Sequence, residues 1–339
     1  MEIKSGHELE QNYRVTSVDE FENNDVDFPE ELSEYPSKPI IIDKNQSILK
    51  SLFSIVIFGI AFYFLFGWDV ISLTMLIGVI LVHELGHFVA MKLFNYKDLG
   101  IFFIPLVGAY ASGEIDEVSQ RQQILISLAG PVPGIIIGSL LVYFGLVTEN
   151  NLLYKPGAIF LLLNLFNLLP VLPMDGGRII QTLFFHQKET ITIVLLWVSI
   201  GLFGFYGIYT ENWIILLVCF LIFMQINART KNIKVKKNLK EKGFDTNKSF
   251  SELTNEEYWK IRGVMASNMR VIGNLTTPDN YSEVPDEKTI IKTMKSIVQK
   301  PPVETLGVWG KVFFFLIWLF SFTIPLIITL LLMFLNRPL

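Results

Sequence analysis

Three ionisable side chains lie inside an otherwise uncharged apolar stretch of this 339-residue chain. The stretch runs from Ile71 to Met91 and contains the sequence His83-Glu84-Leu85-Gly86-His87. Residues four apart lie on one face of a helix, so His83 and His87 can bind one metal ion while Glu84 reaches a water molecule beside it. Because ionisable groups are costly at membrane depth, the pattern indicates metal-assisted hydrolysis.

The histidine pair leaves such a site one ligand short, since a catalytic zinc ion usually takes three protein ligands and keeps a fourth position for water. Asp175 is the only other carboxylate embedded in an apolar stretch of comparable depth. Pro170, Pro173 and the glycine that follows Asp175 would break a helix locally and free the backbone to turn the carboxylate inward. We expect Asp175 to be the third ligand. The alternative is a helix-capping carboxylate paired with Arg178.

The elements that must position these residues are those of a membrane protein. Hydrophobic residues make up 51% of the chain, and 28 residues are Phe. Most apolar runs are long enough to cross about 30 Å of hydrocarbon. We therefore expect an all-α polytopic membrane protein with about seven transmembrane helices, of which the sixth is the least certain. The runs cover residues 51–68, 70–94, 122–147, 157–185, 190–209, 212–227 and 311–335.

The polar segments divide the chain into regions. The insert has two helical patterns, at Glu256–Met269 and Glu287–Gln299, but few aromatic anchors. We read six regions: an acidic cytosolic tail (1–48), an accessory span (49–69), a catalytic membrane core (70–187), accessory spans (188–227), a cytosolic insert (228–310) and a C-terminal span (311–339).

Basic residues predict the orientation of the spans, because Lys and Arg near span ends collect on the cytoplasmic side. A cluster of cations from Arg229 to Lys242 places the end of the sixth span inside. Counting back puts the N-terminus in the cytosol and places both His87 and Asp175 in the cytoplasmic third of their spans. A net charge of −4 and the absence of a binding motif give no indication of nucleic acid.

Residues 100–114 mix Gly, Pro and aromatic side chains and are too broken for a membrane helix. We predict a re-entrant hairpin or loop on the cytosolic side, beside the span that carries the histidines. An extended substrate could pair with this hairpin as an added strand. Gly108 and Tyr110 are the residues that we expect to contact the substrate there.

The two motifs together resemble those of the site-2 protease family of intramembrane zinc metalloproteases. The family has H-E-x-x-H and, two spans later, N-x-x-P-x-x-x-L-D-G. This chain has the first at His83–His87 and departs from the second only in Met174, which replaces Leu. The resemblance covers roughly residues 70–185, and no PDZ or cystathionine-synthase-type domain is recognised. The second motif consists of Asn167, Pro170, Met174, Asp175 and Gly176.

The resemblance implies a three-span core that holds Zn²⁺ through His83, His87 and Asp175. Glu84 would be the general base, and the Asn167 amide would help to stabilise the oxyanion. Asn164 shares the helical face of Asn167 and competes with it for this role. The substrates would be transmembrane proteins, cleaved within the lipid bilayer of what we expect to be a bacterial cell membrane.

Two other functions fit some of the same residues. A zinc transporter could use the buried ligands as a transit site, but transporters usually show repeat symmetry, and here one ligand cluster stands alone. A catalytically silent relative could bind membrane partners, but the intact Glu84 argues against it. We therefore expect an intramembrane zinc metalloendopeptidase.

Overall fold

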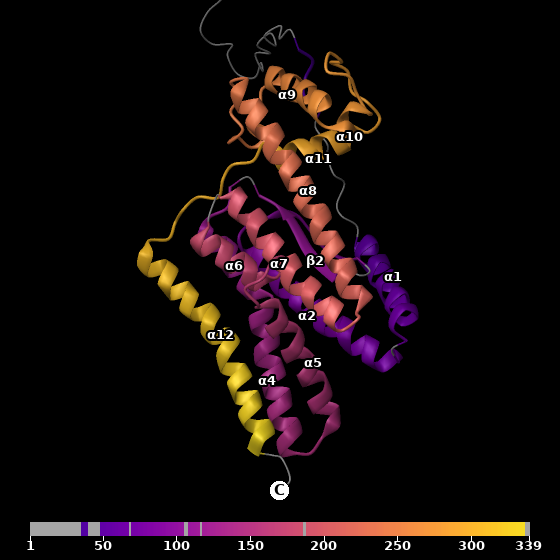
Figure 1. Cartoon of the computed structure of the whole chain (residues 1–339), viewed down its shortest axis with the longest axis vertical. Coiled ribbons are helices and arrows are strands. Elements are labelled where there is room, and N and C mark those ends of the chain that lie inside the picture. The colour runs from indigo at the N-terminus through magenta and orange to yellow at the C-terminus, as the bar shows by residue number, and fades with distance from the viewer. Residues whose placement is uncertain are drawn as a thin grey trace, which may run out of the picture.

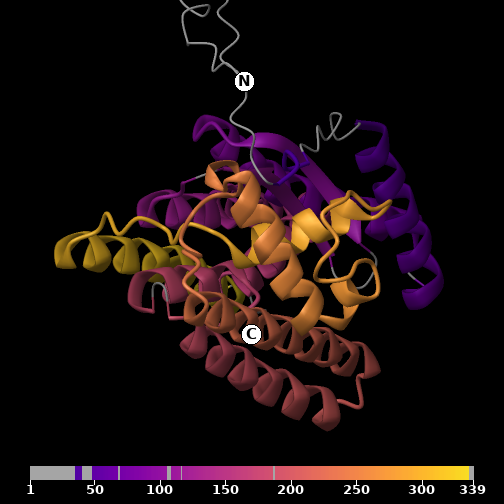
Figure 2. The same ribbon diagram turned by 90° about the horizontal axis from the view of Figure 1, so that it is seen from above.

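The computed structural model of the chain describes residues 35–39, 48–67, 69–104, 108–115, 117–185 and 188–335. The predicted acidic tail (1–48) lies outside these residues except for 35–39 and for Ile48, which begins α1. The described part is mostly helical, as expected (Figure 1). Helices α1 (Ile48–Phe66) and α12 (Val308–Leu335) lie on opposite flanks of the molecule in both views (Figures 1 and 2).

Five described helices are long and apolar enough to cross a membrane. The prediction of about seven spans is therefore not confirmed. The described apolar part of α1 is shorter, at Lys50–Phe64, and the run at 157–185 is not one helix. The five candidate spans are α2 (Val70–Leu93), the joined helices α3 (Gln120–Ala129) and α4 (Pro131–Val147), α7 (Glu189–Tyr209), α8 (Trp213–Glu241) and the Val308–Ile328 part of α12.

The apolar run at 157–185 is not one continuous helix, and the interruption lies at the prolines, as predicted. Helix α5 (Asn151–Asn167) ends there, and α6 (Asp175–Phe184) begins with the aspartate. The connecting turn packs so closely on α6 that a Cβ atom on Gly176 would lie 2.0 Å from the Leu168 carbonyl oxygen. Trp318 of α12 donates its indole N–H to the same oxygen at 3.0 Å. The turn is therefore fixed by a glycine contact and by a hydrogen bond from another helix.

Helices α4 and α5 form a close antiparallel pair (Figure 1). Cβ atoms placed on Gly145 and Gly157 would lie 2.5 and 2.7 Å from backbone nitrogens of the facing helix. Small residues allow such an approach, which supplies van der Waals contact where the hydrophobic effect is weak. This pairing holds Asn164, on α5, against the start of α4.

The segment at 97–114 forms an antiparallel hairpin of β1 (Lys97–Ile104) and β2 (Gly108–Glu114). Strand β1 contacts α1, where the Phe103 N–H donates to Ser54 Oγ at 3.0 Å. Strand β2 contacts α2. A hairpin was predicted here, and its position relative to a bilayer stays a prediction.

The insert is a small helical unit with its own core above the membrane helices (Figures 1 and 2). Helix α8 continues through the predicted boundary at residue 228 and forms part of this core. Tyr258 and Trp259 are buried, so the insert has aromatic anchors that the sequence reading undervalued. The helices predicted at 256–269 and 287–299 are confirmed. The elements are η1 (Phe250–Glu252), α9 (Asn255–Asn268), α10 (Arg270–Gly273) and α11 (Glu287–Ile297).

Backbone hydrogen bonds and an ion pair tie the insert to the residues at the start of α3. Val303, after α11, exchanges backbone hydrogen bonds of 2.9 Å with Val118 and Gln120. Lys300 forms ion pairs with Glu117 at 2.5 Å and with Glu252 at 2.6 Å. The insert is thus joined to the membrane helices by backbone pairing as well as by α8.

Candidate metal centre

Three buried side chains converge between α2 and α6. His83 Nε2 and His87 Nε2 lie 3.1 Å apart, and each lies 3.2 Å from Asp175 Oδ2. All three residues are less than 10% exposed. Helix α2 places the histidines one turn apart on one face, and the break before α6 brings the aspartate to them.

The other ring nitrogen of each histidine, Nδ1, lies next to a hydrogen-bond acceptor whose position is fixed. His87 Nδ1 lies 2.8 Å from the Ile126 carbonyl oxygen, which can only accept a hydrogen bond. His83 Nδ1 lies 2.8 Å from Asn164 Oδ1, and the Asn164 amide group donates to the Phe160 carbonyl at 2.7 Å, which fixes its orientation. Both Nδ1 atoms therefore carry the proton. Both Nε2 lone pairs face the aspartate, as ligands of a metal ion require.

Close backbone contacts leave the rings little freedom. A Cβ atom on Gly130 would lie 2.3 Å from His87 Nε2, and one on Gly134 would lie 2.2 Å from Asn164 Nδ2. A Cβ atom on Gly86 would lie 2.0 Å from the Ala129 carbonyl oxygen. Gly130 and Gly134 lie at and just after the α3–α4 junction. Here they pack directly against the histidine and its positioning residue.

This donor set fits zinc. Two neutral imidazoles and one carboxylate match the ligands of catalytic zinc sites, and tetrahedral bonds of about 2.0–2.1 Å place ligand atoms about 3.3 Å apart. The observed separations of 3.1–3.2 Å are close to that value. Three acceptor atoms facing one another in a buried site would repel without a cation between them.

Glu84 is buried next to the histidines and close enough to them for their charges to interact. Its carboxylate also interacts with the backbone amide of Ala111 in β2. Glu84 is thus held between the metal centre and the hairpin.

The remaining predicted site residues lie outside this cluster. The Asn167 amide donates to the Leu163 carbonyl at 3.1 Å, one turn before it on α5. Gly108 and Tyr110 lie on β2, paired with Ile104 and Phe102 of β1. These placements leave the predicted roles of Asn167, Gly108 and Tyr110 as predictions.

Asn164, which the sequence offered only as a competitor of Asn167 for the oxyanion, instead contacts His83 and is not one of the three candidate ligands. Its burial is complete, whereas Asn167 is partly exposed. Two backbone groups, the Ile126 carbonyl and the Ala111 amide, could not be found from residue types. Any residue supplies these groups, so no sequence signal marks them.

A segment of the chain matches a known family. Residues 71–157 match the family model of peptidase family M50, which confirms the resemblance to the site-2 proteases. This segment includes both histidines and Glu84 and ends before Asp175.

Two curated relatives and one solved structure are similar to parts of the chain. A zinc metalloprotease of Methanocaldococcus jannaschii is 28% identical over 53% of this chain and 56% of its own length. Stage IV sporulation protein FB of Bacillus subtilis is 26% identical over 34% of this chain and 41% of its own. The chain thus spans about half the length of these relatives. The structure of the site-2 protease from M. jannaschii overlaps with 52% of this chain and 86% of that chain at a TM-score of 0.40 and 23% identity, too loosely to support an argument.

Proposed function

We propose that this relative of the site-2 proteases is a zinc metalloendopeptidase that cleaves peptide bonds in or near transmembrane segments. The observation that carries the proposal is the convergence of His83, His87 and Asp175, with both imidazoles oriented by hydrogen bonds on their far sides. Such a site binds a metal ion and keeps a position open for water. The adjacent Glu84 supplies the base that a peptidase needs and a structural metal site does not.

The chemistry divides between the metal ion and the protein. A zinc ion bound by the three ligands supplies Lewis acidity, which lowers the pKa of a water to about 7 and polarises a carbonyl. Glu84 accepts the proton of the attacking water and returns a proton to the leaving amine. The Ile126 carbonyl and the Asn164 side chain keep the imidazole rings in place while the charge at the centre changes.

For the oxyanion, the candidate remains the Asn167 amide, one turn beyond Asn164 on α5. It would have to exchange its hydrogen bond to the Leu163 carbonyl for one to the substrate. Asn164 is less suited to this role because its amide orientation already serves His83. We assign Asn164 to positioning and keep Asn167 as the candidate that contacts substrate.

The hairpin offers an edge to which an unwound substrate could bind. The Phe103 N–H points away from β2 toward Ser54, so Phe103 and Ala109 form a pair without mutual hydrogen bonds. Backbone groups of Ala109 and Ala111 then point outward from the free side of β2. A substrate strand added on this side would have its carbonyls satisfied and would lie beside Glu84.

The orientation belongs to the same proposal. Lys and Arg collect at one end of the candidate spans, which supports a cytosolic N-terminus and a site that opens toward the cytosol. Water then reaches the metal from the cytosol, and the substrates are transmembrane proteins that expose a cleavable segment near that face.

The test uses Glu84→Gln in the full chain, purified in detergent or nanodiscs with a transmembrane peptide as substrate. We expect cleavage to fall by about 10²–10⁴-fold, because a general base and its proton delivery are lost. Zinc content, measured by elemental analysis, should stay near one per chain. Asp175→Asn is the matched control, for which zinc and cleavage should both be lost.

The same experiment separates the alternatives. A zinc transporter would move zinc into proteoliposomes, and the unaltered chain would not cleave the peptide. A silent relative would show no metal-dependent cleavage in the unaltered chain. Either result would contradict the proposed function.

A further inference from the structure

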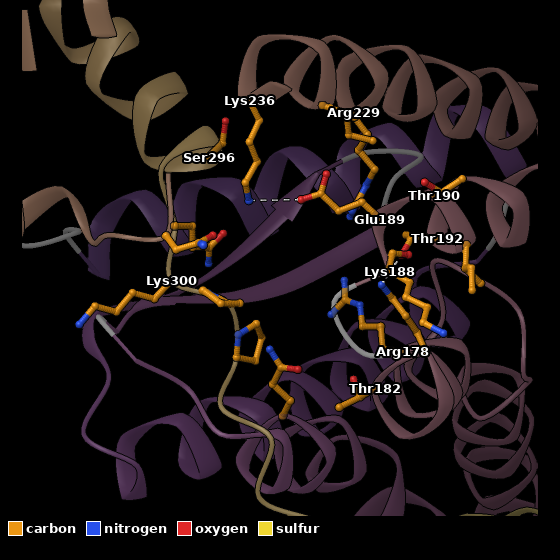
Figure 3. A pocket seen from close by; sticks show the side chains of 18 of the residues that line it. Arg178, Thr182, Lys188, Glu189, Thr190, Thr192, Arg229, Lys236, Ser296 and Lys300 are labelled. Atoms are coloured by element: carbon orange, nitrogen blue, oxygen red, sulfur yellow. Dashed lines mark hydrogen bonds and ion pairs between the residues drawn. The ribbon is translucent and has the colours of Figure 1, made fainter. Parts of the chain in front are cut away.

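A large open cavity separates the membrane helices from the insert. Its volume is about 1120 Å³, and it is lined by the ends of α2 and α3, by α6, by the start of α7, by the polar half of α8 and by the insert after α11. Figure 3 shows Ser296 and Lys300 of the insert on one side and Arg178 and Lys188 on the other. The cavity is separate from the metal centre, because the three candidate ligands are not among the residues that line the cavity.

The cavity is strongly cationic. Among the described residues, seven Lys and Arg side chains line it, against one acidic residue, Glu189. Glu189 pairs with Lys236 at 3.5 Å, and Lys300 is engaged by Glu117 and Glu252. Four cations have no hydrogen bond or ion pair from their side chains to the part of the chain that the structure describes. They are Arg178, Lys188, Arg229 and Lys240.

The unpaired cations come from separate segments. Arg178 is on α6, Lys188 precedes α7, and Arg229 and Lys240 are on α8. Arg178 and Arg229 are close enough for their positive charges to repel each other, and Arg229 is also attracted by the Glu189 carboxylate without forming an ion pair with it. The rule that cations collect at the cytoplasmic end of spans accounts for their number. It does not account for their convergence on one concave surface.

Neutral hydrogen-bond donors lie among these charges. Thr182 and Thr190 line the cavity, as do the side chains of Gln123 and Gln299. Lys188 makes no side-chain cap at the start of α7. A group with several acceptor oxygens and more than one negative charge would satisfy both the donors and the cations.

We propose that this cavity binds a phosphate-bearing anion between the membrane helices and the insert. A phosphate ester carries a charge of about −1.5 to −2 and three acceptor oxygens, which matches several converging cations better than one carboxylate does. Arg178 and Arg229 offer planar guanidinium groups that bind phosphate with two hydrogen bonds each. The ligand is the headgroup of an anionic phospholipid or a soluble phosphate monoester.

The test compares Arg178→Gln/Arg229→Gln with Lys231→Gln/Lys234→Gln in the full chain. The control variant also removes two positive charges, but it removes them from two lysines of α8 that do not line the cavity. One arm titrates glycerol phosphate by calorimetry into protein held in phosphatidylcholine nanodiscs. The other uses native mass spectrometry to count phosphatidylglycerol molecules retained from mixed phosphatidylcholine–phosphatidylglycerol nanodiscs.

We expect binding in at least one arm, about ten-fold or more weaker in the arginine variant and unchanged in the lysine control. Binding in the lipid arm alone identifies a headgroup, and binding in the soluble arm alone identifies a free phosphate ester. Equal weakening in both variants, or no binding in either arm, would overturn the proposal. Lys188→Gln should also weaken binding, and unchanged melting temperatures would show that the variants are folded.

Discussion

Asn164 is a buried side chain that contacts the candidate metal centre without being one of its three ligands. It accepts from His83, donates to the Phe160 carbonyl, and would be displaced by a Cβ atom at Gly134. Its amide therefore fixes both the tautomer and the direction of the imidazole. Metal affinity depends on such contacts nearly as much as on the ligands.

Asn164→Leu should lower zinc affinity by about 10–100-fold, because the leucine removes the acceptor that orients His83. Competition with a fluorescent chelator would measure the change. Asn167→Leu is the matched control on the same helix and should keep zinc affinity. If Asn167 contacts the oxyanion, that variant should lose cleavage instead. Unchanged cleavage in Asn167→Leu would remove it from the mechanism.

At the scale of the elements, the β1–β2 hairpin places the unpaired edge of β2 beside Glu84. Proline at Tyr110 would remove a hydrogen bond to β1 and so disturb the hairpin itself. Proline at Ala109 removes an N–H that points outward and leaves the β1 pairing in place. Position 109 therefore tests strand addition more directly than the two positions that the sequence suggested.

Ala109→Pro should reduce cleavage of a transmembrane substrate by about ten-fold or more if the substrate pairs with β2, since one hydrogen bond to an edge is lost and proline blocks close approach. Ala109→Val keeps the N–H, favours a strand and should cleave normally. Steady-state cleavage of a labelled transmembrane peptide measures both. Equal rates for proline and valine would exclude strand pairing at this edge.

The insert depends on a buried ion pair. Arg262 donates to Glu287 through two nitrogens, at 2.8 and 2.9 Å, and to the Asn280 carbonyl at 2.6 Å. Burial, followed by the hydrogen bond to Glu287, raises the pKa of Tyr258 above its ordinary value. The hydroxyl therefore stays protonated and donates to the same carboxylate.

Glu287→Gln should destabilise the insert by about 3–5 kcal/mol, because it leaves a buried guanidinium charge without its partner. Hydrogen exchange across residues 255–297 of the full chain would show faster exchange there than in α2. Glu283→Gln, at an exposed position nearby, should have little effect. If hydrogen exchange across these residues were as slow in Glu287→Gln as in the unaltered chain, the ion pair would not stabilise the insert.

At the scale of the whole molecule, the metal centre joins segments that are distant in the sequence. The histidines belong to α2, and the aspartate begins α6, after the α4–α5 pair. A metal ion bound by both would therefore crosslink the folded core. Binding to the folded chain alone stabilises it by mass action, by about 2.7 kcal/mol at a concentration 100 times the dissociation constant.

Zinc should therefore raise the thermal midpoint of the metal-free protein in detergent, and a chelator should lower it again. The expected shift is a few degrees. Asp175→Asn keeps the size of the side chain, removes the charged ligand and should show no zinc-dependent shift. A shift of the same size in Asp175→Asn would place the stabilising zinc somewhere else on the chain.

The sequence by itself predicted the candidate ligands of the metal centre and the mostly helical architecture. Ionisable residues in apolar runs are so costly that His83, Glu84, His87 and Asp175 stood out by residue type alone. Prolines and glycines marked the break before Asp175, and apolar length marked the helices. Local patterns have a fixed physical meaning along one segment, which is why these predictions could be made without a structure.

The tertiary structure alone decided what lies across from each residue. The contact of Asn164 with His83, the Ile126 carbonyl behind His87 and the position of Glu84 beside β2 all depend on how the helices and the hairpin pack. So does the convergence of Arg178 and Arg229 on one cavity. Contacts between distant segments depend on packing distances of a few ångströms, and backbone groups, which every residue carries, leave no mark in the sequence.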